Sequence, residues 1–387
     1  MKKLLCVILC ILLAAPPVFA AVGFDDLPDD HWAVDTIRLA RENGIIEGYN
    51  ENGTWLFKPD NNVSRQECMT MLYRTLSKAG MLTEDAEEAS DGQSSGASES
   101  SGAAAQPGGS AADGGLSAKW AETMKACGIA EWAWSYCAYG FESGILEEGD
   151  FAASGASGFG GGAAASRQLI ARWTARAMGY ELSPLCQIVY SDYLDIDPEN
   201  RQYVDALYRK HIMEGSDGLF HGNDGVRRSE MAAVCTRLLG LDPKFAGMAD
   251  VDPLMNFSGT LSELSAEQGI IRLSFQSVSL YVADGARVAL DGTAAKLSDI
   301  SALSGSKITV SAYVGGENSV VIQSRPVVQH GTVKGVESER GRDVISMELE
   351  NGIRITLVTD GDSDVPTIRR NRSYDFISDG ILILEMR

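Results

Sequence analysis

The chain has 387 residues, of which 44% are hydrophobic and 22% are charged, and its formal net charge is −20. This length has room for two or three domains, each with its own core. The negative charge argues against nucleic-acid binding, which requires a basic surface. The same charge is typical of a solvated extracellular surface, so composition alone identifies no partner.

The first twenty residues have the pattern of an export signal. Lys2 and Lys3 form the basic start, residues 4–15 the apolar stretch, and Val18-Phe19-Ala20 the cleavage site. The apolar stretch is shorter than the about 20 residues of a membrane-spanning helix, although a retained N-terminal anchor is the alternative. No later segment is apolar enough to span a membrane. We therefore expect a secreted protein that is not inserted in a membrane after signal cleavage.

The first structural unit is expected over residues 21–80. Apolar residues recur at helical spacing from Trp32 to Ala40, and Gly44 follows as a helix-ending residue. Gly48 permits the next bend. A second helix begins after Ser64, which forms an S-x-x-E capping box with Glu67. The unit is therefore predicted to be a helix–loop–helix.

Residues 81–115 have a different composition. They are mostly Ser, Gly, Ala, Asp and Glu, with almost no large apolar residue. Such a segment cannot bury enough surface to offset the entropy lost on ordering. We predict a disordered acidic linker.

A second unit, predicted over residues 116–180, repeats the first in degenerate form. Trp132 and Gly144 have the same spacing as Trp32 and Gly44. A Gly/Ala-rich tract replaces the polar loop, and Arg167 follows it as Arg65 does in the first unit. Because Leu169 occupies the place of the capping glutamate, we expect this helix to lack the capping box.

A third unit is predicted over residues 181–241. Its segment Ile212-Met213-Glu214-Gly215 matches Ile45-Ile46-Glu47-Gly48. Its segment 226–230, Val-Arg-Arg-Ser-Glu, likewise matches Val-Ser-Arg-Gln-Glu at 63–67. Three related helix pairs build surfaces between repeats rather than one catalytic pocket.

From about residue 250 the chain alternates polar with apolar residues, as half-buried strands do. Such stretches are Ser277–Val282, Lys307–Ser311, Val344–Leu349 and Ile353–Val358, and Glu350-Asn351-Gly352 is a hairpin signal between the last two. We predict two small antiparallel, barrel-like β modules at 250–328 and 329–387. The fold class is therefore multidomain α plus β, with a helical array followed by all-β modules.

Five cysteines follow the signal: Cys68, Cys127, Cys137, Cys186 and Cys235. An odd number without a CxxC pair or nearby histidine argues against zinc and against a complete disulfide framework. Cys68 and Cys235 lie on apolar helical stretches, where cysteine behaves as a small core residue. No cofactor or metal is expected.

The order of motifs resembles the S-layer homology (SLH) domain of bacterial surface proteins. The motifs are an Asp-rich start, Trp-Ala, Gly-Ile-Ile-x-Gly, Phe-x-Pro and Val-Ser-Arg-x-Glu, over about residues 24–240. The resemblance implies a pseudo-threefold array whose second helices gather centrally, with grooves between neighbouring copies. It also implies non-covalent anchoring to the cell wall through an anionic, often pyruvylated secondary wall polysaccharide. S-layer proteins are further candidate partners.

The candidate ligand-binding residues come from these motifs. They are Arg65, Arg167, Arg228, Glu67, Glu230, Trp32, Trp132, Gly48 and Gly215. The arginines stand in the first turn of a helix, where the backbone N–H groups and the helix dipole favour an anion, and their guanidinium groups suit a carboxylate. We expect exposed guanidinium groups. A structural interpretation also remains open for each. It is solvated surface for the arginines, capping for Glu67, orientation of Arg228 or a helix-dipole contact for Glu230, core packing for the tryptophans and turn formation for the glycines.

No catalytic constellation is evident. The four histidines, His31, His211, His221 and His330, are scattered, and no G-x-S-x-G, HExxH or P-loop pattern is present. Residues 360–364 alternate carboxylates but lack the remaining EF-hand ligands, so we expect a β-turn there, with weak calcium binding as the alternative. We predict a non-enzymatic protein. Alternatives are an S-layer or surface-assembly protein acting through protein contacts, and an anchored enzyme or inhibitor in the β modules.

Overall fold

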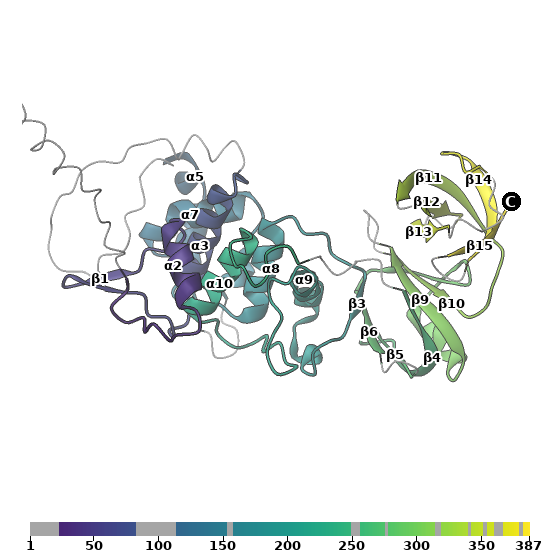
Figure 1. Cartoon of the computed structure of the whole chain (residues 1–387), viewed down its shortest axis with the longest axis horizontal. Helices are drawn as coiled ribbons and strands as arrows, with labels where there is room; N and C mark the ends of the chain where they lie inside the picture. The colour runs from purple at the N-terminus through teal and green to yellow at the C-terminus, as the bar shows by residue number, and fades with distance from the viewer. Residues whose placement is uncertain are drawn as a thin grey trace, which may run out of the picture.

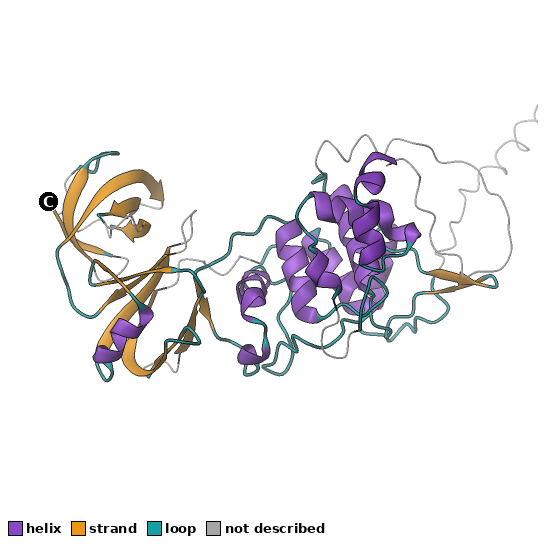
Figure 2. Cartoon of the chain, turned by 180° about the vertical axis from the view of Figure 1, so that it is seen from behind, coloured by secondary structure: helices purple, strands orange, loops and turns teal. Residues whose placement is uncertain are grey.

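The computed structural model has most of its helices at one end and its two larger β sheets at the other (Figures 1 and 2). It describes residues 23–82, 114–152, 158–248, 256–274, 278–313, 319–339, 342–350, 354–359, 367–378 and 382–387. The predicted export signal, most of the predicted linker and the acidic turn at 360–364 lie outside these residues. No helix in the described ranges is long and apolar enough to cross a membrane.

The first copy of the repeat contains α2 (Val34–Glu42), the hairpin β1 (Tyr49–Glu51) and β2 (Thr54–Leu56), and α3 (Arg65–Lys78). The capping box predicted for α3 is confirmed. The Ser64 hydroxyl accepts from the Glu67 N–H at 3.3 Å, and the Glu67 carboxylate accepts from the Ser64 N–H at 2.9 Å. Two otherwise unpaired donors at the start of α3 are thereby satisfied.

The second copy is built from α5 (Gly114–Lys119), α6 (Ala121–Ala126), η1 (Glu131–Ala133), α7 (Trp134–Glu142), η2 (Glu148–Phe151) and α8 (Arg167–Ala177). Within the described residues, Ser166 makes no side-chain capping bond to α8. The predicted loss of the capping box at Leu169 is thus confirmed.

The third copy contains β3 (Leu185–Gln187), η3 (Tyr193–Asp195), α9 (Pro198–Arg209) and α10 (Arg228–Leu238). His211, which stands where the first copy has Gly44, adopts the same left-handed conformation, with φ of 56°. The left-handed residue that ends the first helix is therefore present in both copies.

The three copies close into a ring. Each second helix packs against the first helix of the next copy: α3 on α7, α8 on α9, and α10 back on α2. The backbone just before these second helices forms a matching ring. Val63 donates to Val226 at 2.8 Å, Val226 donates to Ala165 at 3.0 Å, and Ala165 donates to Val63 at 3.0 Å. The predicted pseudo-threefold array is confirmed.

One hydrophobic core runs through all three copies. In the part of the chain that the structure describes, all five cysteines are buried and free of disulfides. Cys68 and Cys235 therefore do pack as small core residues, as the sequence predicted. Burial raises the pKa of Cys235 to about 12, so its thiol stays neutral.

The first β sheet has the strand order β3-β6-β5-β4-β9-β10-β7-β8. Its strands are β4 (Asn256–Ser265), β5 (Ile270–Leu273), β6 (Val278–Val282), β7 (Arg287–Leu290), β8 (Thr293–Ala295), β9 (Lys307–Tyr313) and β10 (Ser319–Gln323), with η4 (Leu297–Leu303) before β9. The strands predicted at Ser277–Val282 and Lys307–Ser311 are present as β6 and β9.

The second sheet is antiparallel and curled, in the order β13-β12-β11-β14-β15 (Figure 1). It contains β11 (Gln329–Glu339), β12 (Arg342–Leu349), β13 (Arg354–Val358), β14 (Ser373–Ser378) and β15 (Ile383–Met386). The two outer strands approach each other at a bridge between Val358 and Leu382. The predicted pairing of β12 with β13 is confirmed, although residues 351–353 of its turn lie outside the described residues.

The helical array is joined to the first sheet by strand pairing and by side-chain contacts. Strand β3 belongs to the third copy by sequence but pairs with β6, with Cys186 opposite Tyr281. The Arg201 guanidinium lies 5.6 Å from the Tyr193 ring centre and 5.0 Å from that of Tyr281. The position of the array is thus coupled to that of the sheet.

Candidate functional site

The first turns of α3, α8 and α10 were predicted to offer free N–H groups to an anion. In the structure, loop carbonyls of a neighbouring copy accept from the first N–H of each helix: Ala163 from Arg65 at 2.9 Å, Asp224 from Arg167 at 3.0 Å, and Asn61 from Arg228 at 2.8 Å. The second N–H groups are likewise bonded to Gly161, Gly222 and Pro59. These donors hold the copies together, so the first two N–H groups of each helix are not free to bind an anion.

The signature arginines also face a neighbouring copy. Arg228 pairs with Glu67 at 2.8 Å, and Arg167 pairs with Glu230 at 2.9 Å. Arg65 and Arg228 are only 2% and 7% exposed. The expectation of exposed guanidinium groups is therefore wrong for these two, while Arg167 is half-buried. Closure of the ring turns the start of each helix toward protein instead of solvent.

The third link of this kind is missing, because Leu169 stands where the other copies have Glu67 and Glu230. Arg65 donates instead to the Ala152 carbonyl at 3.0 Å. Its Nε is buried and has no hydrogen-bond partner within the described ranges. Burial lowers the pKa of Arg65, and the negative charge of Asp150 opposes that shift.

Glu67 is the centre of a compact polar cluster. Besides Arg228, it accepts from the Ser64 hydroxyl at 2.7 Å and from the Tyr49 hydroxyl. Burial alone would raise the pKa of Glu67, but Arg228, Tyr49 and Ser64 outweigh burial and hold the pKa below its ordinary value. The carboxylate therefore remains charged at neutral pH.

Arg228 completes this cluster. Its Nε donates to the Phe57 carbonyl at 2.8 Å, and its guanidinium lies 4.7 Å from the Tyr49 ring centre and 5.0 Å from that of Phe57. The pair of Glu67 and Arg228 is thus neutral as a unit and fixed on several sides.

An open groove lies beside this cluster, enclosing about 430 Å³ of space that includes solvent. All three copies contribute to it, and four of the nine predicted site residues line it: Gly48, Glu67, Trp132 and Arg228. The remaining lining residues are Ile45, Ile46, Glu47, Tyr49, Thr70, Met71 and Arg74. We call this the first groove.

Both predicted glycines form turns. Gly48 has φ of +81°, and a Cβ there would lie 2.3 Å from a ring carbon of Phe24 and 2.7 Å from the Leu56 carbonyl oxygen. Gly215 has φ of +72°, and its Cβ would lie 2.3 Å from the Leu219 carbonyl oxygen. The turn interpretation is confirmed for both, and Gly48 lines the first groove as well.

The two tryptophans differ. Trp132 is half-buried against the core and lines the first groove. Trp32 is 60% exposed, so the core-packing interpretation is wrong for this residue. Its ring lies near His31, at 5.8 Å between ring centres.

Sequence reasoning missed a second set of arginines, Arg74, Arg176 and Arg237. Each follows the signature arginine of its copy by the same number of residues. Arg74 pairs with Glu47 at 3.0 Å, and Arg176 pairs with Glu147 at 2.9 Å. Their recurrence in all three copies was the signal that could have identified them.

A family model for the S-layer homology domain matches residues 23–68 and 189–232. These segments are S-layer homology domains. They fall in the first and third copies, whereas the second copy, predicted to be degenerate, has no matched segment. The chain therefore contains S-layer homology domains in its first and third copies.

Curated relatives match short stretches of the chain. A cellulosome-anchoring protein of Acetivibrio thermocellus is 34% identical over 68 residues, which are 18% of this chain and 14% of the relative. The S-layer protein sap of Bacillus anthracis is 34% identical over 65 residues, 17% of this chain and 8% of the relative. Cell surface glycoprotein 1 of Acetivibrio thermocellus is 41% identical over 59 residues, 15% of this chain and 2% of the relative. The chain thus spans a small part of each relative's length.

Proposed function

We propose that this protein anchors itself non-covalently to the cell wall by binding an anionic secondary wall polysaccharide in the first groove. The observation that carries the proposal is the groove itself, because it places an aromatic side chain and a guanidinium group beside one open space. The names of the matched relatives, a cellulosome-anchoring protein and S-layer proteins, agree with a surface-anchoring role. The proposed role is non-enzymatic.

The groove has the chemistry that such a ligand requires. Trp132 offers an aromatic surface to a sugar ring. Arg74 lines the same groove and is held by Glu47, whose own side chain is 47% exposed. A carboxylate of the polymer can replace Glu47 and form a bidentate pair with Arg74. Glu67 and Arg228 form a neutral wall of the groove that does not repel an anion.

The proposal is tested by sedimenting the full chain with purified walls, before and after chemical removal of the secondary polymer. We expect binding to intact walls, competition by the free polymer, and at least a tenfold loss of affinity on stripped walls. Equal binding to both wall preparations would favour assembly through protein contacts and contradict the proposal.

A pair of tryptophan variants localises the binding. Trp132→Ala removes the aromatic surface of the groove and should lower wall affinity about tenfold, since an aromatic ring contact contributes about 0.5–1.5 kcal/mol beyond the area that it buries. Trp32→Ala is the matched control, since Trp32 is exposed and is not among the residues lining the first groove. Thermal unfolding of both variants checks that the array remains folded. Equal losses in the two variants would place the site elsewhere.

A further inference from the structure

We propose that this chain binds wall polymer through the first groove alone, because its own side chains occupy the corresponding positions in the other two grooves. This inference rests on the proposed function and adds the number of working sites. Its basis is the set of side chains that occupy equivalent positions in the three copies.

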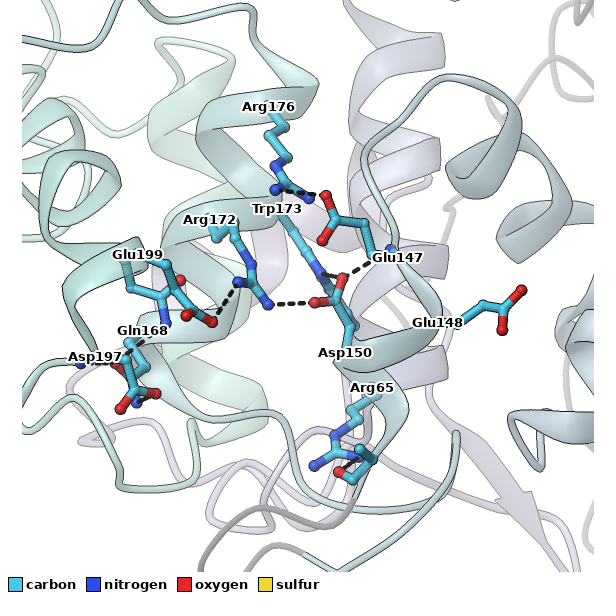
Figure 3. A network of polar contacts seen from close by, with 12 residues as sticks. Arg65, Glu147, Glu148, Asp150, Gln168, Arg172, Trp173, Arg176, Asp197 and Glu199 are labelled. Carbon is cyan, nitrogen blue, oxygen red and sulfur yellow. Dashed lines mark hydrogen bonds and ion pairs between the residues drawn. The ribbon is translucent and has the colours of Figure 1, made fainter. Parts of the chain in front are cut away.

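The place between the second and third copies that is equivalent to the first groove is called here the second groove, and there Asp150 supplies a carboxylate from within the protein. Its side chain is only 1% exposed and accepts hydrogen bonds from Arg172, from the Trp173 indole N–H at 2.7 Å and from the Glu147 N–H at 2.9 Å. Figure 3 shows Arg172 between this carboxylate and Glu199 of α9. Arg172 donates to the Glu199 carboxylate at 3.1 Å. The guanidinium therefore has internal carboxylates on two sides.

The first groove has none of these groups at the matching positions. When the copies are aligned on their loops and signatures, Asp150, Arg172 and Trp173 correspond to Asn50, Thr70 and Met71. The third copy also contributes Glu199 to the second groove at the position where the second copy contributes Trp132 to the first. The second groove thus has the Glu199 carboxylate at the position where the first groove has the Trp132 ring.

An anionic ligand would have to displace Asp150 to reach Arg172. Displacement would leave a buried carboxylate without its cation, which is strongly unfavourable. Asp150 also lies close enough to Arg65 of the first copy to act on its charge. Asp150 belongs to the second copy, whose helix α8 has Leu169 in place of the signature glutamate. We infer that Asp150 replaces the negative charge of that missing glutamate. The second groove therefore holds the copies together instead of binding a ligand.

At the equivalent place between the third and first copies, called here the third groove, the segment that follows α10 packs against the arginine. Arg237, the counterpart of Arg74, lies 3.8 Å from the Phe245 ring centre and 3.6 Å from the Asp242 carboxylate. Its Nη1 donates to the Ile212 carbonyl at 2.9 Å. Both the face and the edge of this guanidinium are therefore used within the chain.

The test compares two equivalent arginines. Arg74 and Arg176 have side-chain exposures of 15% and 20%, and each pairs with a glutamate of its own copy. Isothermal titration of the full chain with soluble wall-polysaccharide fragments should give one site per chain. Arg74→Gln should lower the affinity at least tenfold, whereas Arg176→Gln should stay within twofold of wild type.

The outcomes separate the two proposals. Two or three sites per chain, or an equal loss in Arg176→Gln, would overturn the single-groove inference and leave wall anchoring in place. Failure of the wild-type chain to bind the fragments or walls would overturn wall anchoring and the single-groove inference together. Thermal unfolding of both variants confirms that a loss of affinity is not a loss of fold.

Discussion

The first and second copies of the repeat have the same helix–loop–helix plan but different polar groups at the start of the second helix. In the first copy, Glu67 pairs with Arg228 and accepts hydrogen bonds from the Tyr49 and Ser64 hydroxyls. The second copy has Leu169 at that position, and its buried carboxylate comes from the loop, through Asp150. Both arrangements are compatible with the backbone ring and the shared core. The signature therefore serves two separable purposes: joining the copies and shaping a groove.

The signature arginines have a different role from the predicted one. They were predicted as ligand contacts, yet Arg228 and Arg167 each make an ion pair with a glutamate of another copy. Arg74 has a more accessible pairing partner and lines the open groove. In our proposal the signature arginines position the copies, and the arginine further along the helix meets the polymer.

The largest expected effect concerns the stability of these links. Arg228→Met leaves the Glu67 carboxylate without its cation and should lower the free energy of unfolding by about 3–5 kcal/mol. Arg65→Met removes a guanidinium that has no signature glutamate and whose Nε is unpaired in the described part of the chain. Its cost should be smaller, about 1.5–3 kcal/mol, the value of a hydrogen bond that involves a charged group, because Asp150 acts on Arg65 only through space. Urea denaturation of the two variants measures the difference, and equal losses would show that the two links are equivalent.

A smaller effect is expected at the glycines of the first copy. Ala at position 48 would be strained at positive φ and would clash with Phe24 and the Leu56 carbonyl. Gly48→Ala should therefore cost about 2–4 kcal/mol. Gly44→Ala is the matched control, since its φ is +73° but no atom lies within 4 Å of the added Cβ. Its cost should be about 1–2 kcal/mol. The same urea titrations apply, and a larger loss in Gly44→Ala would contradict the packing argument.

Much of the fold was predictable because local signals decide it. The Ser64 capping box, the repeated spacing of the helices and the alternation of the strands all depend on nearby residues. The burial of Arg65 and Arg228 was not predictable from one helix, because it arises when the loop of another copy covers the helix start. Strand β3 has three residues and gains its partner only from the distant β6.

The candidate site was predicted in part for the same reason. The repeated motif identified Gly48, Glu67, Trp132 and Arg228, which the structure brings to one groove. Arg74 was not predicted because it lies nine residues beyond Arg65, outside the signature motif. The role of Asp150 was not predictable, since it depends on which loop carboxylate meets Arg172 after the copies assemble.

The smallest expected effect is a pH dependence that belongs to the first copy. Because the folded-state pKa of Glu67 is depressed, its contribution to stability is present above the unfolded-state pKa of about 4.3 and is lost as pH falls through the lower folded-state value. Glu67→Gln removes this titration. The unfolding free energy of the variant should therefore fall less than that of wild type as the pH is lowered from about 5, and the difference should be that of one titrating group. Urea denaturation at a series of pH values measures both curves. Parallel curves would show that Glu67 does not hold its negative charge through the contacts with Arg228, Tyr49 and Ser64. A flatter curve for Glu67→Gln would tie the acid sensitivity to the link that the second copy lacks.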